Sequence, residues 1–248
     1  MTTSWDATTY DRVSGIQEAW ALGVLDRLPL AGDETVLDAG CGSGRVTRHL
    51  LERLPRGRVI AVDASEEMVQ HARRALGDRA TVLHADLVEL ELPEPVDAVF
   101  SNAVFHWIDD HARLFERLHA ALRPGGALVA QCGGRGNLAG FLATVADVAA
   151  EAPFDRHLAG FERPSTFSGA AETEQRLRAA GFAQARAWLS PSDVRPQDAA
   201  GFLRAVLLRC HLERLPDDLR EPFVAAVLAR RGDPPLLDYR RLDIDARA

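Results

Sequence analysis

The stretch that decides the fold is VLDAGCGSG, at residues 36–44. A short apolar run precedes Asp38, and Gly40, Gly42 and Gly44 then alternate with small residues just before a helical pattern begins. Glycine permits the tight turn that joins a strand to a helix, and it lets a ligand approach the backbone closely. Because the first turn of a helix attracts negative charge, we expect this turn to bind an anionic part of a ligand.

The spacing of these glycines excludes two common nucleotide sites. A dinucleotide fingerprint reads G-x-G-x-x-G, whereas this chain has Arg45 where the fingerprint has its third glycine. A phosphate-binding P-loop needs a lysine, and the chain contains no lysine. The same absence removes Schiff-base chemistry. We therefore expect a smaller anion, such as an amino-acid carboxylate.

Two carboxylates follow the next strand-like runs along the chain. Asp63 ends the second run, 19 residues after Gly44, where a carboxylate suits the two hydroxyls of a ribose. Asp86 follows the third run, beside apolar Leu87, and can accept a hydrogen bond from an adenine amino group. Adenosine carrying an amino-acid tail therefore satisfies all three positions.

Strand-like and helical patterns alternate through the first two thirds of the chain. Short apolar, partly β-branched runs predict strands at 35–38, 58–62, 81–84, 96–100 and 127–130. Apolar stripes of helical period lie between them: Ser65 begins one helix, Asp109 and Asp110 begin another, and the turn at 123–126 ends it. This alternation predicts an α/β fold with a doubly wound, mostly parallel sheet covered by helices on both faces.

The last third of the chain has a different organisation. Segments 137–160 and 196–231 are mainly helical, and between them lie a helix that ends at Gly181 and a strand near 185–189. A closing strand at 237–244 brings the sheet to seven strands. We interpret the helical segments as insertions between late strands that form a cap over the carboxyl edge of the sheet.

Length and composition fit one globular domain, with 47% hydrophobic and 26% charged residues among 248. We divide it into an N-terminal helical segment at 1–30, a ligand-binding core at 31–136, cap insertions at 137–170 and 196–234, and closing helix and strands at 171–195 and 235–248.

The charge balance and the cysteines narrow the function classes. The chain has 29 basic and 36 acidic residues, a net charge of −7, which disfavours a nucleic-acid-binding surface. No apolar run approaches the roughly 20 residues that a membrane helix needs. Three cysteines at unrelated spacings favour a reducing cytoplasm. No histidine pair has metal-binding spacing, so we expect no metal. The expected partner is a small molecule, and the expected assembly is a monomer or weak dimer.

In combination these features resemble the class I S-adenosylmethionine-dependent methyltransferases over residues 34–132. The turn at 38–44, Asp63, Asp86 and the LRPGG turn at 122–126 stand in that family's order. The resemblance implies a Rossmann-like methyltransferase fold and S-adenosylmethionine as the cofactor. It also implies the residues that contact the cofactor: Gly40 and Gly42 at the methionine part, with Asp38 and Cys41 in the same turn, Asp63 at the ribose, Ala64 and Met68 beside the adenine, Asp86 and Leu87 at its edge, and Asn102 near the methionine amine. We interpret Cys41 as a small filler of the turn and not as a nucleophile.

A narrower resemblance concerns the methyl acceptor. SNAVFHWIDDH at 101–111, the aromatic residues Trp5, Tyr10 and Trp20, and YRRLDIDAR at 239–247 resemble the trans-aconitate methyltransferase group. Malonyl-carrier-protein carboxyl methyltransferases and juvenile hormone acid methyltransferases are similar. The resemblance implies methyl esterification of a carboxylic acid. It also implies an N-terminal lid in which Tyr10 contacts the cofactor and Trp20 the substrate; packing of these aromatic residues within an amphipathic helix is the alternative.

His106 is the candidate catalytic residue, because it lies just after the fourth strand with Trp107 beside it. A carboxylate acceptor is already ionised near neutral pH and needs no base, so His106 would orient it. A phenolic or alcoholic hydroxyl, or a carbon, of a natural product would instead need His106 as a general base. A histidine that only packs the cofactor site is the third reading.

Trp107 and Arg135 are the further candidates for substrate binding. Arg135 lies in the turn after the fifth strand and can hold a carboxylate bidentately, although an exposed loop arginine is the alternative. The late part of the chain supplies several arginines but no dedicated base: Arg135, Arg156, Arg163, Arg204 and Arg209. A nicotinamide-dependent oxidoreductase and a non-catalytic cofactor-binding protein are the two other classes that the sequence leaves open.

Overall fold

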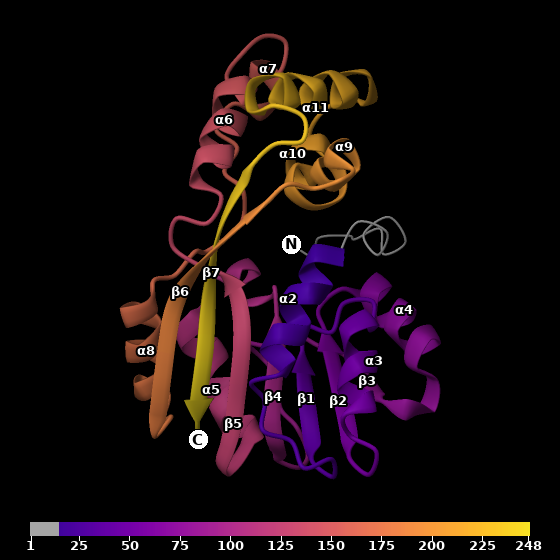
Figure 1. The fold of residues 1–248 in the computed structure, drawn as a ribbon, viewed down its shortest axis with the longest axis vertical. Helices are drawn as coiled ribbons and strands as arrows, with labels where there is room; N and C mark the ends of the chain where they lie inside the picture. The colour runs from indigo at the N-terminus through magenta and orange to yellow at the C-terminus, as the bar shows by residue number, and fades with distance from the viewer. Residues whose placement is uncertain (1–14) are drawn as a thin grey trace.

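The computed structural model describes the chain from residue 15 to residue 248 (Figure 1), with side chains from Glu18 onward. Seven strands form one sheet in the order β3-β2-β1-β4-β5-β7-β6. Their bounds are β1 Thr35–Ala39, β2 Arg58–Asp63, β3 Thr81–His84, β4 Val96–Asn102, β5 Leu122–Gly133, β6 Gln184–Val194 and β7 Leu237–Arg247. Strands β1 to β5 pair in parallel, and β7 is antiparallel to both β5 and β6. The predicted fold class is confirmed.

Helices cover both faces of the sheet because successive strand residues point to opposite sides. Val36 of β1 packs in a cluster with three helices on one face, and Leu37 packs with two helices on the other. The first face carries α2 (Gly15–Leu25), α3 (Arg45–Glu52) and α4 (Glu66–Leu76); the second carries α5 (His111–Ala121) and α8 (Ala170–Ala179). The predicted helix starts are confirmed, since Ser65 caps α4 and Asp110 caps α5.

The strand order places a ligand site at one edge of the sheet. From β1 the chain proceeds outward to β2 and β3, and it then returns to the other side of β1 to form β4. Ligands of doubly wound sheets bind where the order reverses in this way, at the carboxyl ends of the strands. Figure 1 shows these ends directed toward the helices that follow β5.

The late helices gather beyond that edge in a cluster of their own (Figure 1). Between β5 and β6 lie α6 (Ala139–Ala149) and α7 (Asp155–Leu158); between β6 and β7 lie α9 (Ala199–Phe202), the π-helix η3 (Leu203–Leu207), α10 (Arg209–Leu212) and α11 (Asp217–Arg231). Phe141, Phe202 and Phe223 are fully buried in this cluster, together with Tyr239 of β7. Among the described residues, no helix combines the length and apolar character required to cross a membrane.

The strands of the second half are longer than predicted. β6 and β7 pair along their whole length, from Gln184 opposite Arg247 to Val194 opposite Leu237, and so form a ribbon that reaches the cap helices (Figure 1). Polar residues alternate along this ribbon, so the apolar pattern predicts only 185–189 of β6 and 237–244 of β7. The turn expected at 123–126 does end α5, but it belongs to β5, where the register shifts between the pairs made by Val96 and Ala98.

Candidate functional site

The glycine turn after β1 is fixed by contacts with the neighbouring strands. Gly40 has a φ of +89°, and a Cβ there would lie 2.2 Å from the side chain of Val104, in the loop after β4. Gly42 has a φ of +54°, and a Cβ there would meet nothing within 4 Å. The backbone N–H groups of Gly40 and Cys41 donate to the carbonyl of Val62 in β2. Gly40 therefore allows close packing, whereas Gly42 leaves open space beside the turn.

Two carboxylates flank this turn: Asp38 is buried and Asp63 is half-buried. Asp63 accepts hydrogen bonds from the backbone N–H groups of Gly42 and Ser65, both at 2.9 Å. Asp38 accepts from the hydroxyl of Thr47 at 2.7 Å. Burial raises the pKa of Asp63, and burial together with the nearby charge of Asp63 raises the pKa of Asp38 to about 7. Both carboxylates are therefore poorly solvated when ionised, and a ligand with hydroxyl donors or positive charge would stabilise them.

The other predicted cofactor residues follow neighbouring strands. Ala64 is exposed just after β2, and Met68 is buried on α4. Asp86 is exposed after β3 and accepts from the backbone N–H of Val88 at 3.1 Å, while Leu87 beside it is buried in the core. One residue of the predicted set, Tyr10, lies outside the described residues. The register aligns the ends of β2, β3, β1 and β4, so the described members share one edge of the sheet.

Cys41 shares the turn and is almost completely buried. Burial raises the pKa of its thiol, and the charges of Asp38 and Asp63 raise it further. The thiol therefore stays protonated, which agrees with a filler of the turn and not with a nucleophile. Within residues 15–248 no group of three or more histidine, cysteine, aspartate or glutamate side chains is placed to hold a metal ion.

His106 lies in a short 3-10 turn, η2 (Phe105–Trp107), directly beyond β4. It is only 8% exposed, and its ring stacks on Phe167 with centroids 6.0 Å apart. Its Nδ1 accepts a hydrogen bond from the backbone N–H of Gly133 at 3.2 Å. Burial lowers the pKa of His106 well below its usual value, and the positive charges of Arg241 and Arg163 lower it further.

These contacts define the protonation state of His106. A neutral imidazole carries one proton, and because Nδ1 is the acceptor for Gly133, that proton must be on Nε2. At neutral pH His106 is therefore an uncharged hydrogen-bond donor. For Nε2 to accept a proton, the proton it carries would first have to move to Nδ1, which removes the Gly133 hydrogen bond, and the product would be a buried imidazolium next to two arginines.

Two tryptophans of the predicted substrate site each lie under an arginine. The guanidinium of Arg163 lies 4.9 Å from the centroid of the Trp107 ring. The guanidinium of Arg241 lies 4.6 Å from the ring of Trp20, whose Nε1 donates to Ser192 at 3.0 Å. Because both arginines also act on His106, the structure brings these aromatic and basic side chains into one region between the strand ends and the cap.

Arg135 has a different environment. Its side chain is 69% exposed and forms an ion pair with Glu172 of α8 at 2.9 Å. The structure thus gives this arginine a carboxylate partner of its own, at the surface.

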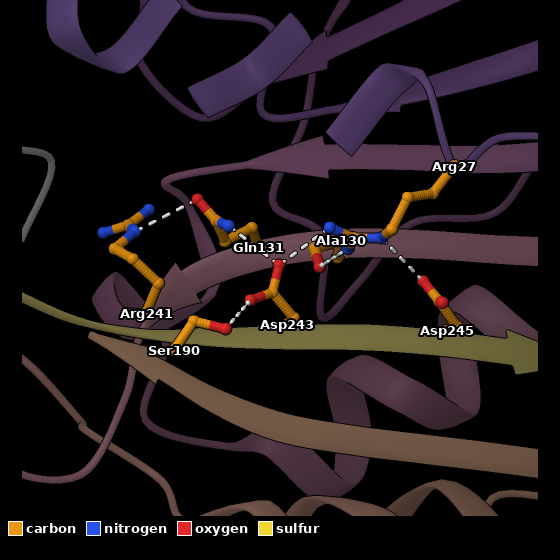
Figure 2. Close-up of polar contacts among 7 residues, drawn as sticks. All are labelled: Arg27, Ala130, Gln131, Ser190, Arg241, Asp243 and Asp245. Carbon is orange, nitrogen blue, oxygen red and sulfur yellow. Dashed lines mark hydrogen bonds and ion pairs between the residues drawn. The ribbon is translucent and has the colours of Figure 1, made fainter. Parts of the chain in front are cut away.

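A buried network that sequence reasoning missed holds Arg241 in place (Figure 2). Arg27, just after α2, donates to Asp243, which also accepts from Gln131 at 2.8 Å and Ser190 at 2.9 Å. The amide oxygen of Gln131 in turn accepts from Nε of Arg241 at 3.2 Å. The signal in the sequence was the alternation of charges at 241, 243 and 245 with apolar residues at 242, 244 and 246, which places the charges on one face.

A depression of about 490 Å³ on the outer side of α2 and α3 lies apart from these residues. Charged side chains line it and neutralise one another: Glu18 pairs with Arg45 at 2.5 Å and with His49 at 2.8 Å. None of the predicted site residues lines this depression. We therefore locate the candidate site at the carboxyl ends of the strands.

Comparisons with known proteins identify relatives of this chain. Residues 36–126 match a family model described as a methyltransferase domain. A trans-aconitate 2-methyltransferase of Azoarcus sp. (strain BH72) is 42% identical over 128 residues, which is 52% of this chain and 50% of that protein. The chain spans about half the length of several further relatives of that name. The relative from Variovorax paradoxus (strain S110), also a trans-aconitate 2-methyltransferase, is 31% identical over 244 residues, covering 96% of this chain and 93% of that protein.

A solved structure supports the fold. Haemonchus contortus phosphoethanolamine N-methyltransferase 2, in complex with S-adenosyl-L-methionine, aligns with a TM-score of 0.62 and 20% sequence identity. The alignment covers 98% of this chain and 56% of that chain.

Proposed function

Because this chain belongs to the class I S-adenosylmethionine-dependent methyltransferase family, we propose that it methylates a carboxylate oxygen of a small organic acid. The relatives named trans-aconitate 2-methyltransferase make trans-aconitate the first acid to test. Family membership also removes the nicotinamide-dependent oxidoreductase from the alternatives.

The residues around the glycine turn fit S-adenosylmethionine. Gly42 leaves open space beside the turn, and Asp63 is a half-buried carboxylate suited to the ribose hydroxyls. Asp38, with its pKa raised to about 7, gains most from a cation nearby. The cofactor supplies a methyl group on a positively charged sulfonium sulfur. The protein must align an acceptor oxygen with that methyl group within roughly 3–3.5 Å and exclude water.

The protonation state of His106 is the observation that favours a carboxylate acceptor. A phenol or alcohol needs a base to remove its proton, and the hydrogen bond from Gly133 leaves Nε2 of His106 as a donor. A carboxylate is already ionised near neutral pH and requires only to be held in position. A donor Nε2–H on His106 suits that task.

The cysteines and the charge support the remaining proposals. Cys41, Cys132 and Cys210 are free thiols, which supports a reducing, cytoplasmic location. We propose a monomer or weak dimer that acts on a small molecule and binds neither nucleic acid nor membrane, in line with the net charge of −7.

The test is to incubate the protein with methyl-labelled S-adenosylmethionine and a panel of acids, phenols and amines, and to identify the product by mass. We expect label only on the acids, with trans-aconitate among them, and we expect base to hydrolyse the product as an ester. Label on phenols would favour the hydroxyl alternative with His106 as base, and label only on amines, protein or nucleic acid would contradict the proposal. Cofactor binding without turnover of any acceptor would support the non-catalytic alternative.

A further inference from the structure

Five arginines in and beside the cap segments differ in how their charge is balanced. Three of them have a carboxylate partner: Arg135 pairs with Glu172, Arg204 with Glu221, and Arg209 with Glu213. Arg156 is exposed on α7, where water solvates its charge. Arg163 has neither a carboxylate partner nor a fully exposed position.

Arg163 lies in the segment between α7 and α8, which crosses over the end of β4. The backbone N–H of Thr166 in this segment donates to the carbonyl of His106, and Phe167 stacks on the His106 ring. The guanidinium of Arg163 lies on the face of Trp107, and its Nη1 is buried without a hydrogen-bond partner among residues 15–248. The groups that act on its charge are Cys210, Tyr239 and Arg209, and none of them is a carboxylate.

The histidines around Arg163 provide no negative charge to balance its guanidinium. Arg163 lowers the pKa of both His106 and His211, and burial is the larger cause at each. The pKa of His211 falls to about 4, so neither histidine is charged at neutral pH. His211 Nδ1 is likewise buried without a partner among the described residues. An arginine remains protonated under these conditions. Arg163 is half-buried, and with one buried guanidinium nitrogen unpartnered and no carboxylate acting on its charge it costs folding free energy, which an anionic ligand at the guanidinium would offset.

We propose that Arg163 binds a second carboxylate of the substrate, separate from the one that is methylated, and thereby selects acids with two or more carboxylates. This inference rests on the proposed function. His106 adjoins β4 and the predicted cofactor residues. Arg163 instead contacts Trp107, and its charge interacts with Cys210 and Tyr239, which lie with the cap helices. The reacting carboxylate thus belongs beside His106 and the second beside Arg163. A bidentate guanidinium on the reacting carboxylate would also withdraw charge from the attacking oxygen, which argues for this division.

The test is calorimetric binding to the full chain saturated with S-adenosylhomocysteine, so that no methyl transfer is required. The variant is Arg163→Gln, and Arg156→Gln is the matched control, since it removes the same charge from an exposed position nearby. We expect Arg163→Gln to weaken binding of trans-aconitate by about 10- to 100-fold, the range of a charge-assisted pair, and Arg156→Gln to leave it within twofold. Crotonate, which has one carboxylate, should bind weakly and equally to all three proteins.

Several results would overturn the inference. The inference would be overturned if wild-type protein bound S-adenosylhomocysteine but not trans-aconitate. It would also be overturned if wild type and Arg163→Gln bound trans-aconitate with equal affinity. An equal loss for crotonate and trans-aconitate would mean that Arg163 holds the reacting carboxylate. The melting temperature separates a structural role from a ligand role: we expect Arg163→Gln to melt at or above the wild-type temperature, because it removes a half-buried charge that no carboxylate balances. Wild type that binds trans-aconitate through Arg163 without methylating any acid would refute the proposed function alone.

Discussion

Replacing Asp38 by asparagine should change how stability depends on pH. The pKa of Asp38 is raised from 3.8 to about 7 in the folded protein, so between these values the folded chain holds a proton that the unfolded chain has released. Its contribution to stability is therefore complete below about pH 4 and is lost as the pH rises through about 7. At about 1.4 kcal/mol per pKa unit, the loss is roughly 4 kcal/mol. An amide cannot ionise, and its oxygen can still accept from Thr47, so Asp38→Asn should avoid this loss.

Denaturant unfolding at pH 5, 6, 7 and 8 measures the effect. We expect Asp38→Asn to be more stable than wild type by roughly 1.5 kcal/mol at pH 5, and this difference to grow to roughly 4 kcal/mol at pH 8. Asp33→Asn is the control, because the Asp33 side chain is 62% exposed and should follow wild type throughout. If the difference between Asp38→Asn and wild type does not widen from pH 5 to pH 8, the carboxylate is not desolvated in the way the structure indicates.

We expect cofactor binding to be coupled to the release of a proton from Asp38. A positively charged cofactor beside Asp38 favours the ionised form, so binding near pH 6.5 should release a proton, and affinity should rise with pH by up to about tenfold per unit below pH 7. Calorimetry with S-adenosylmethionine in two buffers of different ionisation enthalpy counts that proton. Wild type should release a fraction of one proton, and Asp38→Asn should release fewer. Proton uptake by wild type, or equal release by both proteins, would contradict this coupling.

Three further substitutions test other parts of the site. Gly40→Ala should destabilise the fold by a few kcal/mol, since its Cβ meets Val104 at a positive φ; Val104→Ala should restore only part of this loss in a thermal melt, and full stability of the single variant would be incompatible with the packing seen here. Asp63→Ala should weaken S-adenosylhomocysteine binding by a few kcal/mol in a calorimetric titration, and unchanged affinity would exclude Asp63 from the cofactor site. His106→Ala should reduce kcat modestly and leave the pH–rate profile unchanged, whereas a loss of about 10²–10⁴-fold with disappearance of a titration limb would identify a general base.

The parallel part of the sheet could be predicted from the sequence because its information is local. Each of β1 to β4 is a short apolar run. The glycine turn at 38–44 identifies the run that precedes it as the first strand of the sheet. The ribbon of β6 and β7 could be predicted only in part, at 185–189 and 237–244. Pro191 and the polar residues beside it gain their strand conformation from pairing with β7, some fifty residues further along the chain, and no local pattern encodes that pairing.

The cofactor half and the substrate half of the candidate site also differ in how far local sequence predicts them. The proposed cofactor half consists of residues at the ends of consecutive strands, so the spacing along the sequence is enough to suggest Asp63 and Asp86 as candidates. The substrate half depends on contacts between distant segments: Arg163 acquires a role only because its loop crosses Trp107. Arg135 had the more suggestive position in the sequence, directly after β5, but the ion pair with Glu172 balances its charge. Burial and pairing, which decide between two such arginines, exist only in the folded chain.

The distribution of charge over the two halves fits the proposed reaction. Asp38 and Asp63 make the cofactor half negative, which suits a cationic sulfonium, and Arg163 and Arg241 make the substrate half positive, which suits a carboxylate. Transfer of a methyl group from a sulfonium to a carboxylate consumes one positive and one negative charge and yields a neutral thioether and a neutral ester. Once the charges are gone, both halves hold their products less strongly than the reactants, so the arrangement that gathers the reactants also promotes product release.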